Sequence, residues 1–343
     1  MSARDIGPPA CMTLLALLLA AVFGDVAAAQ TAVKFALDGK FDGPTAPFAV
    51  GLDKAYFKAE GLDVSVETSA TPLDAITRVA TGAADLGFAD INAMIKYGDQ
   101  HPNTPLTAVF MVYNRPPFAV IARKSRGVAR PKDLEGKKLG APAADPAFAQ
   151  WKILVQANGI DASRVTIENI GFPVREPMLA AAQVDAITGL SFSSYVNLKD
   201  RGAPVDDIVV LLMADYGVEL YGHAVLVNAK FAAEKPDAVK GFLHAVLRGL
   251  KDAVRDPSAA VDAVIKRNDA AKKETELERL RMALRDNIVT PEVRANGYGG
   301  IDPARLDRAI DQIALTHTFK TKPKNGDVFD GSFLPRAAER RAN

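Results

Sequence analysis

The feature that most constrains the fold is a regular alternation of strand-type and helix-type hydrophobic patterns. It begins with VKFALDGKFDGPTAPFAVGLDKAYFKAEGLDV, where a strand pattern at 32–38 leads through a Gly- and Pro-containing loop into a helix pattern at 47–61. The alternation continues with strand patterns at 62–69, 84–90, 106–114 and 118–124 and helix patterns at 71–83 and 91–100. Because strands joined by helices run parallel, this order predicts an α/β fold with helices flanking a sheet.

A second unit along the chain repeats the first. It has strand patterns at 137–142, 165–171, 184–190 and 208–217 and helix patterns at 146–160 and 176–183. In both TGAADLGFAD and AAQVDAITGL a helix ends, an Asp follows and a short apolar strand begins. We interpret Asp85 and Asp185 as turn residues before a strand, and the two units as copies of one architecture.

The remainder of the chain is strongly helical. Helix patterns with charged residues between the apolar positions cover 238–256, 258–268, 275–288 and 303–317. We expect these charges to form solvated faces. The tail from Lys320 contains Pro, Lys, Gly and Asp, and we expect it to wrap the surface or to fray.

The N-terminus has the pattern of a secretory signal peptide. CMTLLALLLAAVF is an apolar run too short for a comfortable membrane span, and Ala27 and Ala29 fit the small-x-small cleavage rule. We therefore expect residues 1–29 to be removed by cleavage between Ala29 and Gln30, the alternatives being a buried helix or an uncleaved anchor. The only cysteine, Cys11, precedes the apolar run, whereas a lipid-modified cysteine would follow it. The expected product is an exported protein without cysteine, which in a bacterium occupies the periplasm.

Charge and motifs exclude several classes of function. The formal net charge of the 343 residues is +1, which suggests neither nucleic acid nor an anionic membrane surface as a partner. The sequence has no GxSxG, P-loop, HExxH or GxGxxG motif, and its four histidines have no metal-ligand spacing. We therefore expect no catalytic residues, no metal and no cofactor.

Four stretches together resemble a known family. They are the stretch quoted first, TRVATGAADLGFADINAMI, VYNRPPFAVIARKSRGVARPKDLEGKKLGAP and AAQVDAITGL. In order and spacing they are similar to periplasmic solute-binding proteins of ABC importers, in the branch that serves nitrate, sulfonates, taurine and thiamine precursors. The resemblance implies a two-domain periplasmic-binding-protein fold (type II), with a mostly parallel sheet flanked by helices in each domain and a two-stranded hinge between them.

The resemblance also implies domain boundaries and a ligand position. Domain I would be discontinuous, 30–121 plus 222–335, domain II would be 122–221, and 336–343 would be a flexible tail. The ligand would lie between the domains. Many members that resemble binders of pyrimidine-type thiamine precursors carry Trp where this chain has Gly39, and Phe41 could supply the missing ring.

The candidate binding residues follow the carboxyl ends of the predicted strands, where ligands bind in parallel sheets. Polar or aromatic residues at these ends are Phe41, Asp42, Thr45, Thr71, Asp90, Asp145, Ser191 and Phe192. Thr45 and Thr71 are also expected to cap helices, and for Asp90 and Asp145 simple N-capping is the alternative to ligand contact. We expect Phe48 to be a core residue.

Three further candidates come from the predicted crossovers and from one loop. Tyr113 and Tyr216 lie where the chain is expected to pass between the domains, so they could contact a ligand or pack in the hinge. Arg175 is the best candidate for an anionic head group, with an ordinary surface arginine as the alternative. We interpret His223 as structural and Trp151 as core.

These observations predict a transport receptor without enzymatic activity. It would be a monomer that binds a small polar organic solute, sulfonate- or taurine-like or a pyrimidine, and delivers it to the transmembrane subunits of an ABC permease. Three Asp residues against one Arg suit a ligand with amine or ring N–H donors as well as an acidic group, and disfavour bare nitrate. The alternatives are an enzyme of the pyrimidine-synthase group with the same fold, or a sensory ligand-binding protein.

Overall fold

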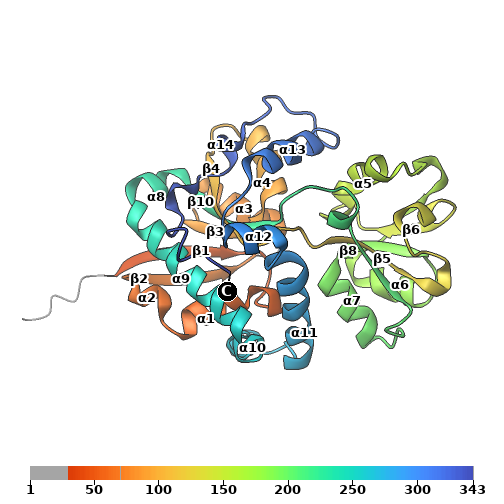
Figure 1. Ribbon diagram of the computed structural model, residues 1–343, viewed down its shortest axis with the longest axis horizontal. Coiled ribbons are helices and arrows are strands. Elements are labelled where there is room, and N and C mark those ends of the chain that lie inside the picture. The colour runs from red at the N-terminus through yellow and green to blue at the C-terminus, as the bar shows by residue number, and fades with distance from the viewer. Residues whose placement is uncertain (1–29, 70, 343) are drawn as a thin grey trace, which may run out of the picture. The chain divides into compact units, whose positions relative to one another are not determined.

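The strands of the protein form two separate sheets in the computed structural model, which describes residues 30–69 and 71–342 (Figure 1). The first sheet has the order β2-β1-β3-β10-β4. Its strands are β1 (Thr31–Leu37), β2 (Leu62–Thr68), β3 (Leu86–Asp90), β4 (Leu106–Met111) and β10 (His223–Asn228). β1 runs parallel to β2 and β3, whereas β10 is antiparallel to both of its neighbours. We call this sheet, together with the helices that pack on it, the first lobe.

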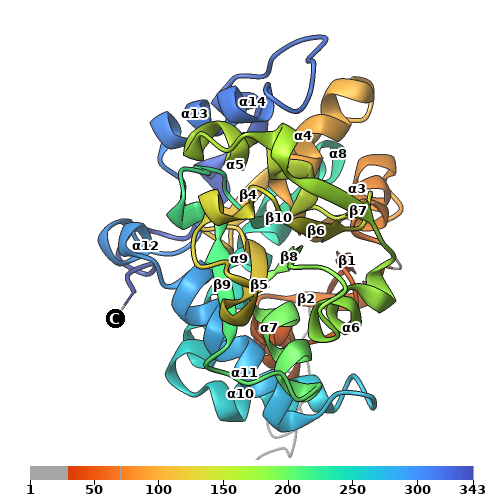
Figure 2. The ribbon, with the colours of Figure 1, turned by 90° about the vertical axis from the view of Figure 1, so that its right-hand side faces the viewer.

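The second sheet repeats this arrangement in the order β7-β6-β8-β5-β9 and faces the viewer in Figure 2. Its strands are β5 (Phe118–Arg123), β6 (Lys138–Ala141), β7 (Thr166–Asn169), β8 (Ala186–Leu190) and β9 (Ile208–Leu212). β5 is the antiparallel strand here, as β10 is in the first sheet. We call this sheet, together with the helices that pack on it, the second lobe. The predicted α/β class is confirmed.

The antiparallel strand of each sheet comes directly after a strand of the other sheet: β5 follows β4, and β10 follows β9. The segments 112–117 and 213–222 connect the sheets and are hydrogen-bonded to each other, since Gly222 N–H donates to the Tyr113 carbonyl at 2.9 Å. Residues 31–343 form one compact unit. The division into domains with boundaries near 121 and 222 stays a prediction, although β5 places Phe118 already in the second sheet.

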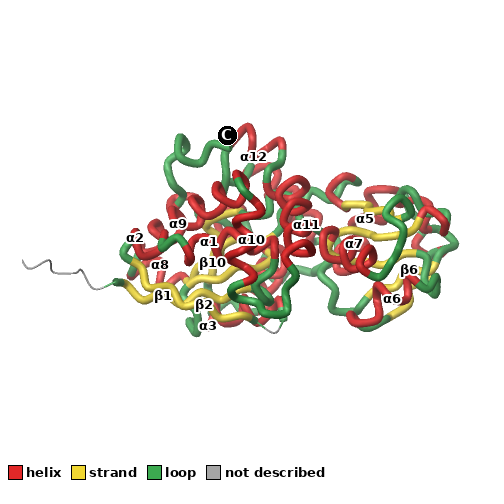
Figure 3. The backbone as a smooth tube through the Cα atoms, turned by 90° about the horizontal axis from the view of Figure 1, so that it is seen from below, coloured by secondary structure: helices red, strands yellow, loops and turns green. Residues whose placement is uncertain are grey.

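Helices cover the sheets. They are α1 (Ala46–Asp53), α2 (Tyr56–Ala59), α3 (Pro72–Thr81), α4 (Ile91–Gln100), α5 (Trp151–Asn158), α6 (Arg175–Ala180), α7 (Ser191–Asp200), α8 (Ala229–Glu234), α9 (Pro236–Arg255), α10 (Pro257–Ile265), α11 (Lys273–Ala283), α12 (Pro291–Asn296), α13 (Pro303–Ile313) and α14 (Asn325–Val328). In Figure 3, α1, α9 and α10 lie on one side of the first sheet and α3 on the other. Among the described residues no helix is long and apolar enough to span a bilayer.

Two helix predictions differ from the structure. The single helix expected at 47–61 is broken at Ala55, whose φ of 54° is left-handed. The break brings the Phe57 ring back against Gly51, where an added Cβ would lie 2.8 Å from the ring. Phe57 thereby reaches the core beside Phe242, with ring centroids 4.9 Å apart. The helix expected at 275–288 is α-helical only to Ala283 and continues as a π-helix over Leu284–Ile288.

The first-lobe core is built on aromatic contacts. Phe35 on β1 lies 5.0 Å from both Phe48 on α1 and Phe242 on α9, and Phe48 lies 5.0 Å from Phe88 on β3. All four side chains are buried, so the expected core position of Phe48 is confirmed. Tilted ring pairs at this spacing stabilise a core beyond the area that they bury.

The two lobes repeat each other in hydrogen-bonding detail. Asp85 accepts from Lys34 N–H at 2.7 Å, and Asp185 accepts from Lys138 N–H at 2.9 Å, so each ties the start of one strand to its neighbour. The structural role predicted for both Asp residues is confirmed. The signal peptide predicted at 1–29 lies outside the described residues.

Gly249 allows α9 to pack directly on α1, because an added Cβ would lie 2.2 Å from the Pro47 carbonyl oxygen. Gly249→Ala should lower the free energy of unfolding by about 1–3 kcal/mol, measured by urea titration, because the helices would have to move apart. Gly98→Ala on α4 is the control, because its Cβ would meet nothing within 4 Å. The control should be stabilised by up to about 1 kcal/mol through helix propensity. Equal effects of both substitutions would contradict this packing.

Candidate functional site

A buried polar cluster lies at the carboxyl edge of the first sheet. Asp38 directly follows β1, Asp90 ends β3, and His223 begins β10 opposite Asp90. His223 Nε2 lies 3.0 Å from Asp38 Oδ2, and its Nδ1 is buried without a hydrogen-bond partner in the described part of the chain. This edge therefore brings two carboxylates and an imidazole together. The sequence predicts a structural role for His223 and does not single out Asp38.

Aromatic rings cover this cluster and reach the second lobe. Tyr113, in the first crossover, lies 5.1 Å from the His223 ring and 5.4 Å from Phe88 in an edge-on contact. Its other neighbour is Phe192, near the start of α7 in the second lobe, with ring centroids 6.4 Å apart. Both side chains are buried. Tyr113 and Phe192 are thus a contact between the lobes beside the polar cluster.

The loop after β1 is held by a capping box. Asp42 Oδ1 accepts from Thr45 N–H at 3.1 Å, and Thr45 Oγ1 accepts from Asp42 N–H at 2.9 Å. These bonds cap the short turn Gly43–Thr45. Thr45 occupies the N-cap position of α1, as predicted, but its side chain makes no capping hydrogen bond there, because its hydroxyl is used within this box. Asp42 is the capping residue.

Glu276 on α11 lies against this loop. Its carboxylate accepts from Gly43 N–H at 2.7 Å and is almost fully buried. Burial raises the pKa of Asp42 to about 6, and the negative charge of Glu276 adds to the shift. The candidate loop thus contains a carboxyl group whose pKa is raised by its surroundings.

Burial also shifts the pKa values of the neighbouring groups. It raises the pKa of Asp90, against the opposing charge of His223. For His223, burial lowers the pKa, but the hydrogen bond to Asp38 and the charges of Asp38 and Asp90 outweigh it, so the pKa is raised. The pKa values of Asp90 and of His223 are thus both raised, the first by burial and the second by its carboxyl neighbours.

A second buried polar cluster lies at the carboxyl ends of β6 and β8 in the second lobe. Asp145 accepts from Thr188 Oγ1 at 2.6 Å and from Ala147 N–H at 3.0 Å. Arg175 donates to Glu176 at 2.8 Å, and its Nη1 lies 3.5 Å from Asp145 Oδ2. Burial raises the pKa of Asp145, and the Thr188 hydrogen bond and the Arg175 charge oppose it. The cluster is the counterpart of the one in the first lobe.

The alternative interpretation of Arg175, an ordinary surface arginine, is wrong, because the residue is buried. Its side chain is 10% exposed and its guanidinium is shared by Glu176, Asp145 and Ser194. Most of its charge is therefore neutralised inside the protein. Glu176, which the sequence reasoning did not select, is its main partner.

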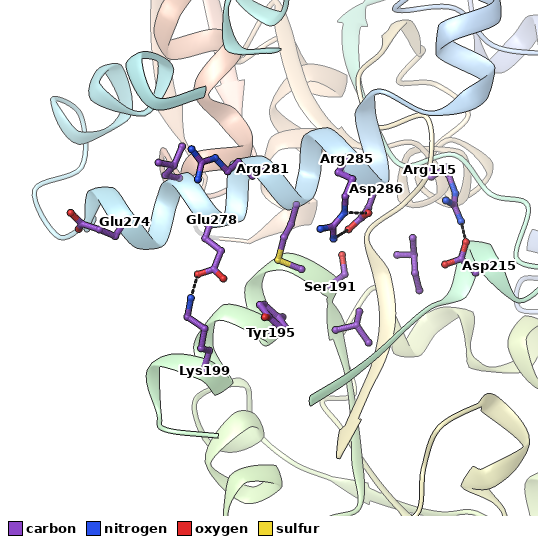
Figure 4. Close-up of a pocket in the computed structure, with 14 residues that line it drawn as sticks. Arg115, Ser191, Tyr195, Lys199, Asp215, Glu274, Glu278, Arg281, Arg285 and Asp286 are labelled. Carbon is purple, nitrogen blue, oxygen red and sulfur yellow. Dashed lines mark hydrogen bonds and ion pairs between the residues drawn. The ribbon is translucent and has the colours of Figure 1, made fainter. Parts of the chain in front are cut away.

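An open groove lies between α11 and α7, beside the crossovers (Figure 4). Its volume is about 830 Å³, and ion pairs join Lys199 to Glu278 and Arg115 to Asp215 across it. Ser191 lines the groove, and its Oγ is buried without a partner among the described residues. The lining residues are Arg115, Ser191, Tyr195, Lys199, Val210, Leu212, Asp215, Glu274, Leu277, Glu278, Arg281, Met282, Arg285 and Asp286.

The structure brings together most, but not all, of the predicted binding residues. Asp90, Tyr113 and Phe192 belong to the first-lobe polar cluster or border it, and Asp42 and Thr45 form the capping box of the loop after β1. Asp145 and Arg175 form the second-lobe cluster, and Ser191 lines the groove. Three others lie apart. Thr71 is exposed and its side chain caps no described N–H group, Phe41 is buried in the core under Arg267, and the Tyr216 carbonyl accepts from Asn158. A ligand role for any of these residues stays a prediction.

Thr71 occupies the N-cap position of α3, as predicted, but its side chain makes no capping hydrogen bond, whereas Asp90 caps α4 by accepting from Ala93 N–H at 2.8 Å. In the described part of the chain, no group of three or more His, Cys, Asp or Glu side chains is placed to hold a metal ion.

A family model described as NMT1/THI5 like matches residues 44–260. The chain is 28% identical to the riboflavin-binding protein RibY of Chloroflexus aurantiacus, over 63% of this chain and 61% of that protein. It is 27% identical to a formylaminopyrimidine-binding protein of Halalkalibacterium halodurans, over 77% of this chain and 79% of that protein. A 4-amino-5-hydroxymethyl-2-methylpyrimidine phosphate synthase of Aspergillus parasiticus is 26% identical, over 64% and 66%. The chain thus spans less than two thirds of the first and third relatives.

Among solved structures, the periplasmic aliphatic sulphonate binding protein SsuA of Escherichia coli is similar with a TM-score of 0.67. The match covers 86% of this chain and 91% of that chain at 11% identity. The periplasmic nitrate-binding protein NrtA of Synechocystis PCC 6803 gives a TM-score of 0.64 at 10% identity, over 89% and 87%. The fold is therefore that of periplasmic binding proteins, as the family resemblance implied.

The raised pKa of Asp42 predicts a specific pH dependence of stability. Because the folded protein holds this proton more tightly than the unfolded chain, stability should fall as pH rises from about 4 to about 6. Asp42→Asn keeps a capping oxygen but does not titrate, so its stability relative to wild type should rise over this range by at most about 3 kcal/mol. Urea unfolding at several pH values measures the difference.

Glu276→Gln should reduce the stability difference between wild type and Asp42→Asn, because it removes the negative charge that helps to raise the pKa of Asp42. Parallel pH curves for wild type and Asp42→Asn would show that Asp42 titrates normally.

Proposed function

The chain belongs to the NMT1/THI5 like family, and on this premise we propose that it is the periplasmic solute-binding component of an ABC importer. It would capture a small polar organic solute between its two lobes and deliver it to the membrane permease. The observation that carries this proposal is the pairing of two buried polar clusters at equivalent strand ends of two sheets that are joined by two crossovers. The similarity in fold to sulphonate- and nitrate-binding proteins supports it.

The charge of the clusters indicates the kind of ligand. The first-lobe site holds Asp38, Asp42 and Asp90 around the single imidazole of His223. The Arg175 guanidinium is largely occupied by Glu176 and Asp145. Carboxylates accept hydrogen bonds, so we infer a ligand with amine or ring N–H donors, such as a pyrimidine or an amino sulfonate. The names of two relatives, which bind riboflavin and a formylaminopyrimidine, agree with a nitrogen heterocycle.

Closure around the solute would follow from contacts made to both lobes. A ligand that touches both clusters stabilises the arrangement in which they face each other, and this differential affinity shifts the population. The crossovers 112–117 and 213–222 would serve as the hinge. Tyr113 and Phe192 would close over the ligand from opposite lobes.

One observation favours a second candidate function, an enzyme of the pyrimidine-synthase group. The His223 imidazole is oriented by Asp38 at 3.0 Å and keeps Nδ1 without a described partner, which is how a general acid or base is held. Several relatives carry the name of such a synthase. Incubating the purified protein with candidate ligands and searching for products by mass spectrometry separates the two, because the receptor should release each ligand unchanged.

A thermal-shift screen over sulfonates, taurine, nitrate, pyrimidines, flavins and aromatic acids should reveal the ligand class. A ligand at about 100 times its Kd should stabilise the protein by about 2.7 kcal/mol. Asp42→Asn and Asp145→Asn should each weaken binding of the best ligand at least about tenfold, because each removes a charged acceptor. Calorimetric titration measures these affinities.

Asp185→Asn is the matched control, because Asp185 precedes β8 and bonds to Lys138, whereas Asp145 bonds to Thr188 in the middle of that strand. It should lower stability without changing affinity. If Asp42→Asn and Asp145→Asn also bind normally, the two clusters are not the ligand site.

Solution scattering tests the closure itself. Addition of the best ligand at saturation should reduce the radius of gyration, because the lobes close around it. An unchanged scattering curve on saturation would contradict a hinge mechanism.

A further inference from the structure

The loop that carries Asp42 is packed directly on α11. Gly43 N–H donates to Glu276 Oε2 at 2.7 Å, and an added Cβ on Gly43 would lie 2.0 Å from the Glu276 carbonyl oxygen. No side chain can therefore separate the loop from the helix. The position of Asp42 depends on where α11 lies.

Arg279, one turn further along α11, joins Glu276 to the second lobe. Its Nη1 donates to Glu276 Oε1 at 2.5 Å, and its Nη2 donates to Asn197 Oδ1 at 2.8 Å. Asn197 lies on α7, whose first residues include Ser191 and Phe192. A continuous chain of charge-assisted hydrogen bonds thus runs from the backbone of the candidate ligand loop to a helix of the other lobe.

Other contacts join the same two helices without reaching the loop. Lys199 pairs with Glu278, as Figure 4 shows, and Thr275 Oγ1 lies 3.4 Å from Asp200. Among the described residues, neither pair is hydrogen-bonded to residues 39–45. Arg279 differs because its two amino groups bond to different lobes.

A role for Arg279 only as the partner of Glu276 does not explain its second hydrogen bond, to Asn197. The Glu276 carboxylate lies close enough to Asp42 to raise its pKa, so a nearby cation is needed to stabilise it. One amino group of Arg279 meets that need, and the second is free for any acceptor or for water. Instead it bonds to Asn197 across the lobes.

We propose that Glu276 and Arg279 are positioning residues that couple the conformation of loop 39–45 to the contact between the lobes. When α7 lies against α11, Asn197 fixes Arg279, Arg279 fixes the Glu276 carboxylate, and Glu276 fixes Gly43 and with it Asp42. When the lobes separate, the loop loses this restraint. The inference rests on the proposed function, because that function gives the loop its ligand.

Amide hydrogen exchange in the absence of ligand tests the coupling. Exchange of Gly43 N–H, followed by NMR, should be about tenfold faster in Arg279→Gln and in Asn197→Ala than in wild type, because a hydrogen bond to a charged group is lost along the chain. The double variant should exchange no faster than either single variant, since both break one chain. Asn197→Asp keeps the acceptor and should restore slow exchange.

Lys273→Gln is the matched control on α11, because it removes an ion pair with Asp262 that stays within the first lobe. It should leave Gly43 exchange unchanged. If Asn197→Ala exchanges like wild type, or if its effect adds to that of Arg279→Gln, the coupling is refuted. Because no ligand is present, this result is independent of whether the ligand screen succeeds.

Discussion

The arrangement of the two lobes depends on two backbone segments that cross between the sheets side by side. Gly222 N–H bonds to the Tyr113 carbonyl, and Tyr113 N–H bonds to the His223 carbonyl, at 2.9 Å each. A side chain on Gly222 would lie 2.8 Å from Tyr113 Cβ, so the two crossovers can approach only because residue 222 is a glycine. The paired crossovers lead into β5 and β10, the antiparallel strands of the second and first sheets.

The same pairing places the first residues of two helices at the crossovers. Ile91 N–H at the start of α4 bonds to the Gly222 carbonyl at 3.1 Å, and Ser191 N–H at the start of α7 bonds to the Pro117 carbonyl at 2.7 Å. Helix starts and strand ends from both lobes therefore gather around one region. A small molecule held at such a region could touch both lobes.

Burial of carboxyl groups in the two lobes shifts their pKa values. Asp42, Asp90 and Asp145 all have raised pKa values for the same first reason, loss of solvent around the charged form. A ligand N–H that replaces water would stabilise the ionised carboxylates. A hydrogen-bond donor is therefore the ligand group that we propose for these carboxyls, whereas the guanidinium of Arg175 is largely neutralised by its own neighbours.

The sequence by itself determined the elements and their order, because hydrophobic period, Asp before each short strand and Asp90 before α4 are local signals. It also indicated Asp42, Asp90 and Asp145 as residues at strand ends. Only the tertiary structure decided what these residues meet. Glu276 and Arg279 belong to a segment with the pattern of a solvated helix face, yet one is buried against Gly43 and the other bridges the lobes. Their partners lie far away in the sequence, and periodicity within one helix carries no information about contacts at that distance.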